Sequence, residues 1–188
     1  MPQSAPVLLD QAAGVPGEIY DSSPSRVLPY ALSPANTQPN IIGATAYTQD
    51  ASTGFALVGQ SGTNVYLGIL ITPKEHASFG TSGGGPFAPT LTLPNGVTAA
   101  FMTMGRVFVT LGASANVGDY VIFDNITGTL TSVAPGVDLP GGKSWANASV
   151  LWYDRTGSGL AVIEMTTAAP ITDTDPSLVA STAKKGAK

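Results

Sequence analysis

The stretch NVGDYVIFDNITGTL, from Asn116 to Leu130, indicates the fold class of this chain. An apolar run from Tyr120 to Phe123 lies between Asp119 and Asn125, and a glycine stands close beyond each of these two residues. A short apolar run enclosed by turn-forming residues is typical of a β-strand that reverses direction at a tight turn. The stretch therefore predicts a strand, a turn and the start of a return strand, with no cluster of titratable side chains beside them.

Short apolar runs separated by turn residues recur on both sides of this hairpin. Residues 65–71, VYLGILI, are typical of a buried strand, and residues 106–111 alternate with period two as in a half-buried strand. Further strands are predicted at residues 41–47, 55–59, 148–153 and 159–165. A short helix is an alternative only near residues 99–104. The pattern predicts an all-β fold, a β-sandwich or small β-barrel with an extended N-terminal arm and a C-terminal tail.

Composition divides the chain into three regions. Residues 1–40 contain prolines at a density that blocks helix and removes ladder donors, so we predict an extended arm with apolar anchors. Residues 41–167 carry the predicted strands and form the β domain. Within them, residues 72–96 hold three consecutive glycines and no strand pattern, which is typical of a functional loop. Residues 168–188 have the composition of a tail.

Charged residues are unusually few. They make up 11% of the sequence, against roughly 25% in ordinary soluble domains, while apolar residues make up 43%. This balance predicts a well-filled core and a surface partly covered by copies of the chain or by a partner. The net charge is −4, the bases are scattered, and no window approaches the length of an apolar membrane span. We therefore expect no nucleic-acid partner and no membrane partner.

The residue types that usually carry catalysis are scarce. The chain has no cysteine and one histidine, His76, whose neighbour Glu75 would project to the opposite face of a strand. The segment from Gly136 to Ser144 resembles a phosphate-binding loop, but Val137 stands where such a loop needs glycine. We therefore predict that the protein is not an enzyme and has no cofactor and no metal site. The alternative, a polysaccharide hydrolase, would depend on a carboxylate of Asp119, Asp124 or Asp138.

Several segments spread over most of the chain resemble one known family. PGEIYDSSPSRVLPY (16–30) resembles the opening of the structural cement, or capsid decoration, proteins of tailed phages, in which a G-x-I-x-D segment precedes a polar stretch. IIGATAY (41–47) is similar to the family's glycine-containing segment before its first core strand, and YLGILITP (66–73) is a further match. The predicted hairpin at residues 116–130 resembles the family's Val-Gly-Asp element, and GSGLAVIEM (157–165) is similar to its closing strand.

The resemblance implies a structural protein that binds the outside of an expanded phage head and stabilises it against the pressure of packaged DNA. It implies a homotrimer in contact with the major capsid protein, because contacts shared across a trimer give avidity. The expected location is the virion, on the outer surface of the capsid, after synthesis in the host cytoplasm without a signal peptide.

The arm and the loop at residues 76–93 are the expected contact elements. We expect apolar side chains there to insert into grooves of the capsid or of a sister subunit, unless they close over the chain's own core. These side chains belong to Val7, Leu8, Leu9, Ile19, Tyr20, Phe79, Phe87 and Leu91.

A second function also fits an all-β chain with few catalytic residues. Another virion β protein, such as a head fibre, a tail component or a receptor-binding module, would bind a cell-surface glycan or protein instead of the capsid. Exposed aromatic side chains around a groove, or a repeated shaft element, would favour that alternative. No internal repeat is evident in this sequence.

Overall fold

The computed structural model describes residues 14–59, 64–72, 92–154 and 159–166. In this part the chain forms a 9-stranded sheet and a separate 2-stranded sheet, and the ladders between strands are antiparallel. The same residues include no helix that could cross a membrane. In chain order the strands are β1 (Arg26–Ala31), β2 (Asn40–Ile41), β3 (Ala46–Gln49), β4 (Ala56–Val58), β5 (Val65–Leu70), β6 (Thr92–Leu93), β7 (Thr98–Thr110), β8 (Tyr120–Asp124), β9 (Leu130–Val133), β10 (Lys143–Tyr153) and β11 (Leu160–Met165).

The large sheet is open. Its strands follow the order β4-β3-β5-β7-β11-β10-β8-β9, and β1 pairs with β7 beside this path. The end strands β4 and β9 do not pair with each other, and a bridge between Thr45 and Thr129 links the two end regions without forming a ladder. A barrel needs a continuous ladder around its circumference. The predicted all-β fold is therefore confirmed, and the small-barrel alternative is wrong.

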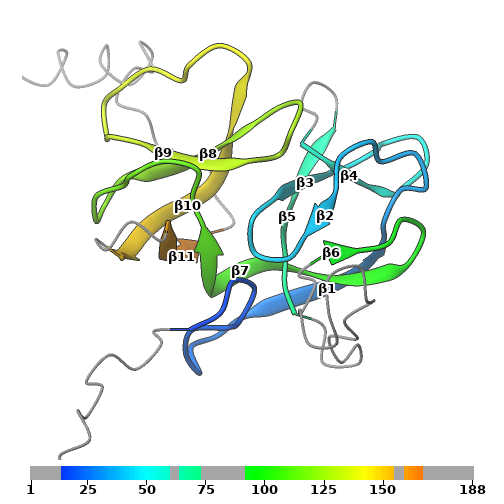
Figure 1. Cartoon of the computed structure of the whole chain (residues 1–188), viewed down its shortest axis with the longest axis horizontal. Helices are drawn as coiled ribbons and strands as arrows, with labels where there is room; N and C mark the ends of the chain where they lie inside the picture. Colours follow the sequence, from blue (N-terminus) through cyan, green and yellow to red (C-terminus); the bar gives the residue numbers. More distant parts are fainter. Residues whose placement is uncertain (1–13, 60–63, 73–91, 155–158, 167–188) are drawn as a thin grey trace, which may run out of the picture.

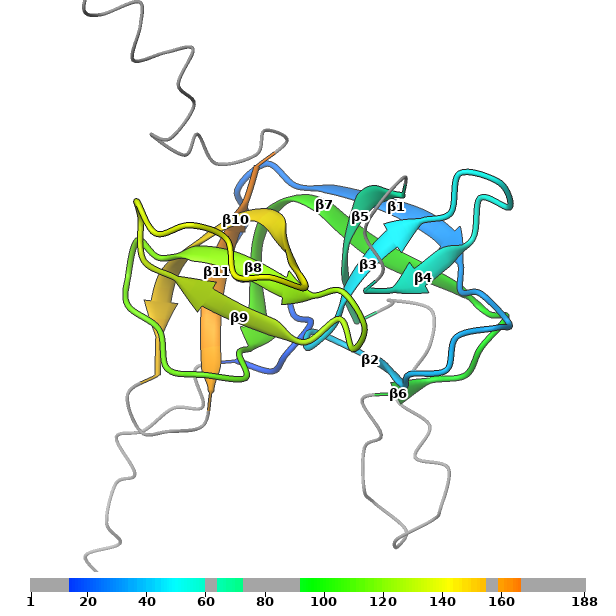
Figure 2. The same ribbon diagram turned by 90° about the horizontal axis from the view of Figure 1, so that it is seen from above.

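β7 is the longest strand and belongs to two lobes of the sheet (Figure 1). Its residues 98–104 pair with β1 and β5, and its residues 105–110 pair with β11. We call β8 to β11 with residues 105–110 lobe A, and β1, β3, β4 and β5 with residues 98–104 lobe B. Gly105 stands where the two halves meet, at a φ of 121° that glycine adopts readily. Figure 2 shows β7 passing from one lobe to the other.

Residues 99–104 lie in β7, so the short helix considered for them is wrong. Phe101 and Met102 are adjacent and both are fully buried, because lobe B is covered by apolar side chains on both faces. Met102 points into one core and Phe101 into another. A strand buried on both faces loses its period-two signal, and periodicity alone then does not separate it from a buried helix.

The first core is shared by both lobes and is aliphatic almost throughout. Alternate residues of β10 enter it, as expected for a strand with one buried face. Its buried members are Ala46, Ile69, Ile71, Met102, Val107, Val109, Leu111, Val121, Phe123, Leu130, Ala146, Ala148, Val150, Ala161, Ile163 and Met165.

The second core lies on the other face of lobe B and combines aromatic rings with a hydrogen-bond network. Tyr47 packs edge-on against Phe101, with ring centroids 5.0 Å apart. Asn40 is 1% exposed, donates to Asn95 Oδ1 at 2.7 Å and accepts from Asn36 and from the Tyr47 hydroxyl at 2.9 and 3.2 Å. Burial raises the pKa of Tyr47, so its hydroxyl keeps its proton and donates to Asn40.

The described part of the predicted arm follows β7. Gly17 N donates to Phe108 O at 2.7 Å, Ile19 forms a bridge with Val107, and β1 continues the pairing to Thr98. Residues 17–31 therefore lie against this chain's own sheet (Figure 2). The division into 1–40, 41–167 and 168–188 stays a prediction.

Candidate functional site

A row of apolar side chains crosses the outer face of lobe A, the face opposite to the first core. Phe108 on β7 stands directly across from Val162 on β11, and Val162 stands across from Trp152 on β10. The neighbours of Phe108 on its strand, Val107 and Val109, point into the first core. Because side chains alternate along a strand, Phe108 and its two partners face outward together. We call Tyr20, Phe108, Trp152 and Val162 the outer band.

A bulge in β10 places Trp152 in the outer band. Val150 pairs with Ile163 and Trp152 with Val162, so β10 has one more residue than β11 over this interval. Regular alternation would turn Trp152 to the same face as Val150, which points into the first core. The extra residue of a β-bulge reverses that alternation and directs the indole outward.

The N-terminal segment covers the centre of the outer band. The ring of Tyr20 meets the ring of Phe108 edge-on at 5.4 Å, and Gly14 passes so close to Phe108 that a Cβ there would lie 2.4 Å from the ring. Phe108 is consequently only 5% exposed. Val162 beside it is 0% exposed, while Tyr20 and Trp152 remain 49% and 38% exposed. The outer band thus offers two half-exposed aromatic side chains beside a buried apolar centre.

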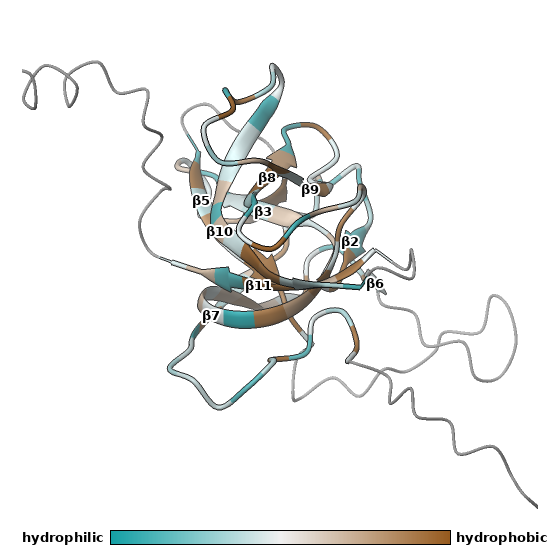
Figure 3. Ribbon diagram, turned by 90° about the vertical axis from the view of Figure 1, so that its left-hand side faces the viewer, coloured by the Kyte–Doolittle hydropathy of each residue, from teal (hydrophilic) through white to brown (hydrophobic). Residues whose placement is uncertain are grey.

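An ion cluster borders the outer band. Arg106, two residues before Phe108 on the same face of β7, contacts Asp21 at 2.9 Å and Glu164 at 3.1 Å. Figure 3 shows hydrophilic and hydrophobic segments following one another along β7. The Ser23 hydroxyl, and then Arg106, lower the pKa of Asp21, and the hydrogen bond to Asp21 raises the pKa of Arg106. Asp21 and Arg106 therefore carry charge at neutral pH. An apolar centre with a polar margin is the usual composition of a protein–protein interface.

Two of the three carboxylates on which the hydrolase alternative depends, those of Asp124 and Asp119, have structural partners. Asp124 accepts hydrogen bonds from the backbone N–H groups of Thr127 and Ile126 at 2.8 and 2.9 Å, and these bonds lower its pKa. Asp119 accepts from the backbone N–H of Asn116 at 2.8 Å. Across the described residues, no three potential metal ligands gather into a group.

Two of the eight predicted contact residues lie in the described chain. Tyr20 belongs to the outer band, whereas Ile19 is partly buried and packs against the first core. The other six lie outside the described residues: Val7, Leu8, Leu9, Phe79, Phe87 and Leu91. His76 lies outside them as well.

Sequence reasoning missed Phe108 and Trp152 as members of the candidate site. Phe108 lies between two core valines on a strand with the predicted period-two alternation. The sequence pattern therefore already indicated that its side chain points outward. Trp152 had no such signal, because its direction depends on the bulge in β10.

Comparisons with known proteins agree with this architecture. A family model described as "Structural cement protein (E217 gp24/Pam3 gp6)" matches residues 2–166. A chain of the solved structure "The capsid of Myoviridae Phage XM1" is 18% identical, with 86% of this chain and 95% of that chain covered and a TM-score of 0.57. At that identity the likeness concerns the fold alone. No curated protein matches the chain.

Proposed function

Because this chain belongs to the family of phage structural cement proteins, we propose that it binds the outer surface of the head through the outer band of lobe A. It is a capsid cement protein and a component of the virion. We propose that the outer band is the face that this protein uses and that its partner is the major capsid protein. The observation that carries the role is the family match over residues 2–166.

The exposure and chemistry of the outer band support its place in the contact. Tyr20 and Trp152 are half-exposed, lie at the two ends of one apolar row and are anchored by buried neighbours. Large aromatic side chains on a rigid sheet lose little conformational entropy on binding and are enriched among residues that dominate interface energies. The nearby Arg106 cluster supplies charged groups for the margin of the contact.

We propose further that three copies bind together as a homotrimer. The low content of charged residues, 11%, supports a chain whose surface is partly covered. Packaged DNA presses outward on a capsid, and a trimer that spans neighbouring subunits would resist their separation through several linked contacts. The six predicted contact residues outside the described chain remain proposed contributors.

A structural role without catalysis is also part of the proposal. The support is the use of Asp124 and Asp119 as acceptors for backbone N–H groups in the turns around β8. Each of these bonds stabilises its turn, and the lowered pKa of Asp124 keeps that carboxyl group ionised, which suits neither a general acid nor a shared-proton pair.

The test is co-sedimentation of the purified protein with expanded heads that lack it, with bound copies counted per head. We expect saturable binding at three copies per local threefold position. Heads that carry the protein should also release DNA at a higher temperature than bare heads. A folded protein that does not bind such heads would contradict the proposed capsid contact and favour a tail or receptor-binding role.

Substitutions test whether the outer band, and not another part of the surface, makes the capsid contact. Tyr20→Ala and Trp152→Ala should each weaken head binding by about tenfold or more, since truncating a hot-spot residue costs about 2 kcal/mol or more and tenfold corresponds to about 1.4 kcal/mol. Ile126→Ala is the matched control, because Ile126 is 75% exposed but lies in the turn between β8 and β9, away from the outer band. Equal affinities for all three variants would exclude the outer band as the contact.

A further inference from the structure

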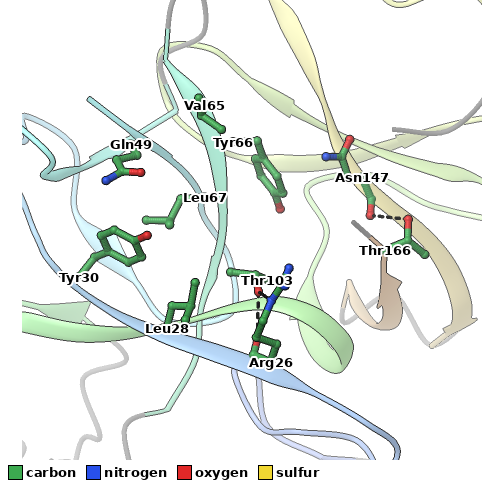
Figure 4. A pocket seen from close by; sticks show the side chains of 10 residues that line it. All are labelled: Arg26, Leu28, Tyr30, Gln49, Val65, Tyr66, Leu67, Thr103, Asn147 and Thr166. Atoms are coloured by element: carbon green, nitrogen blue, oxygen red, sulfur yellow. Dashed lines mark hydrogen bonds between the residues drawn. The ribbon is translucent and has the colours of Figure 1, made fainter. Parts of the chain in front are cut away.

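A groove opens between the two lobes, on a different part of the molecule from the outer band. It has a volume of about 210 Å³ and receives side chains from β1, β3, β5 and β7 of lobe B and from β10 of lobe A (Figure 4). Thr166, which follows β11 directly, completes its wall. Two polar groups of this groove, on Arg26 and Tyr66, have bonding capacity that the described residues do not use.

Arg26 is the first of these groups, and it differs from Arg106. The described carboxylates Asp21 and Glu164 bind Arg106, whereas no described carboxylate lies within ion-pair distance of Arg26. Arg26 Nε donates to Thr103 Oγ1 at 2.8 Å, which orients the guanidinium in the groove and leaves its outer edge for another acceptor. A planar guanidinium held in this way matches the two oxygens of a carboxylate.

Tyr66 is the second group. Its hydroxyl oxygen is buried in the wall of the groove and has no hydrogen-bond partner among the described residues. Its ring stacks on Phe123 of lobe A, with centroids 5.6 Å apart, and this contact holds the side chain at the boundary of the two lobes. A buried hydroxyl without a partner is uncommon in native proteins and indicates a missing acceptor or donor. Burial raises the pKa of Tyr66, so the group can donate its proton to an acceptor.

The chain continues from the wall of the groove. Thr166 N donates to Asn147 O at 2.8 Å, which fixes Thr166, the residue before the segment 167–188, in the same wall as Arg26 and Tyr66. Asp173 and Asp175 follow seven and nine residues beyond Thr166. Seven residues span at most roughly 25 Å, so both carboxylates are within reach of the groove. The family match ends at residue 166, and these residues therefore lie outside it.

The composition of this segment suits an extended occupant. Pro170 and Pro176 enclose Ile-Thr-Asp-Thr-Asp, and proline favours extended backbone in itself and in the residue before it. Two acids in a segment that starts at the groove complement a cation that no described carboxylate neutralises. A tethered segment also binds at a high effective concentration, so that a few contacts are sufficient.

We propose that residues 170–176 of the same chain bind in the groove between the lobes, with a carboxylate of Asp173 or Asp175 accepting hydrogen bonds from the Arg26 guanidinium and the Tyr66 hydroxyl. The segment then joins β1 of lobe B to the end of β11 in lobe A. The inference is independent of the capsid contact, because the groove shares no residue with the outer band.

The experiment measures hydrogen exchange of backbone amides in residues 167–188 of the full chain by NMR, together with the Arg26 Nε–H resonance. We expect amides near Asp173 and Asp175 to exchange about tenfold or more slowly than in an unstructured peptide. Asp173→Asn with Asp175→Asn, and Arg26→Gln alone, should remove this protection. The double variant should also shift the Arg26 Nε–H resonance. Wild-type amides that exchange as fast as an unstructured peptide would overturn the proposal.

Two controls define the occupant. Asp138→Asn removes an acid from an exposed loop outside the groove, so it should leave the protection unchanged. Loss of protection in this variant would assign the effect to net charge and overturn the proposal. Protection should also be independent of protein concentration, because the segment binds within its own chain. Protection that disappears on dilution would overturn binding within one chain and indicate a second copy.

Discussion

The two cores of this protein are built differently from one continuous sheet. The first core, shared by both lobes, is filled by aliphatic side chains that reach it from alternate positions of β10 and from β11 and β7. The second core belongs to lobe B and places Tyr47 and Phe101 against a buried network around Asn40. Aliphatic packing tolerates changes that preserve volume, whereas a buried polar network loses stability when one member is left without a partner. The second core is therefore the more specific of the two.

The strands that line the two cores differ in how many of their faces are buried. In β10 one face is apolar, so Ala146, Ala148 and Val150 alternate with less buried residues. In β5 both faces are covered, and Leu67 points into the second core while Ile69 points into the first. The lobe with two covered faces therefore has continuous apolar runs.

The largest expected effect comes from truncating one residue in each core. Phe101→Ala in the second core should lower the free energy of unfolding by about 3–5 kcal/mol, and Ile163→Ala in the first core by about 2–5 kcal/mol, because each leaves a cavity. β7 runs through both lobes, so we expect one cooperative transition in urea for wild type and variants. Fluorescence and circular dichroism curves that separate into two transitions would show that the cores unfold independently.

A glycine pair tests the close approach of strands in lobe B. A Cβ on Gly68 of β5 would lie 2.1 Å from Met102 O of β7, at a φ of 144°. Gly68→Ala should therefore cost about 3 kcal/mol or more, since β5 must move away from β7. Gly96 has a φ of 79°, but a Cβ there would have no described atom within 4 Å, so Gly96→Ala should cost only about 1–2 kcal/mol. Equal losses in thermal unfolding would contradict this account of Gly68.

The polar network of the second core gives a smaller, graded effect. Asn40→Ala leaves Asn36, Asn95 and the Tyr47 hydroxyl without their shared partner and should cost about 1–3 kcal/mol. Tyr47→Phe removes only the hydroxyl and should cost about 1 kcal/mol. Urea midpoints for both variants measure the difference. A greater loss for Tyr47→Phe than for Asn40→Ala would place the centre of the network elsewhere.

The smallest expected effect is a dependence on pH that both lobes share. Backbone hydrogen bonds lower the pKa of Asp124 in lobe A, chiefly from Thr127, and of Asp50 in lobe B, chiefly from Ser52. A carboxyl group whose folded pKa is lowered contributes stability above its unfolded pKa of about 3.9, and this is lost as pH falls through the folded value. Urea midpoints measured from pH 7 to strongly acidic pH should therefore fall below about pH 4. Asp124→Asn and Asp50→Asn should each flatten this decline, and unchanged profiles would contradict the assignment.

Much of the fold follows from local sequence. The run from Tyr120 to Phe123 with its flanking turn residues forms β8 and the turn into β9, as predicted. The residues 65–71 contain β5, and the predicted strand at 159–165 contains β11. The candidate site was predictable only in part. Tyr20 was expected as a contact residue, and its place on Phe108 arises from the pairing of residues 17–31 with β7.

Local patterning along the chain is sufficient to establish that the fold is all-β, where most strands lie, and that few residues are available for chemistry. Those properties depend on period-two alternation, turn residues and composition, which act over a few neighbouring positions. Long-range contacts are needed to turn Trp152 outward, to direct Phe101 and Met102 into different cores, and to pair Arg106 while Arg26 faces a groove. Each of these depends on a bulge, a register or a lobe boundary. Such features are fixed by contacts between residues far apart in the chain, and the sequence of a single strand does not specify which strand it pairs with or in which register.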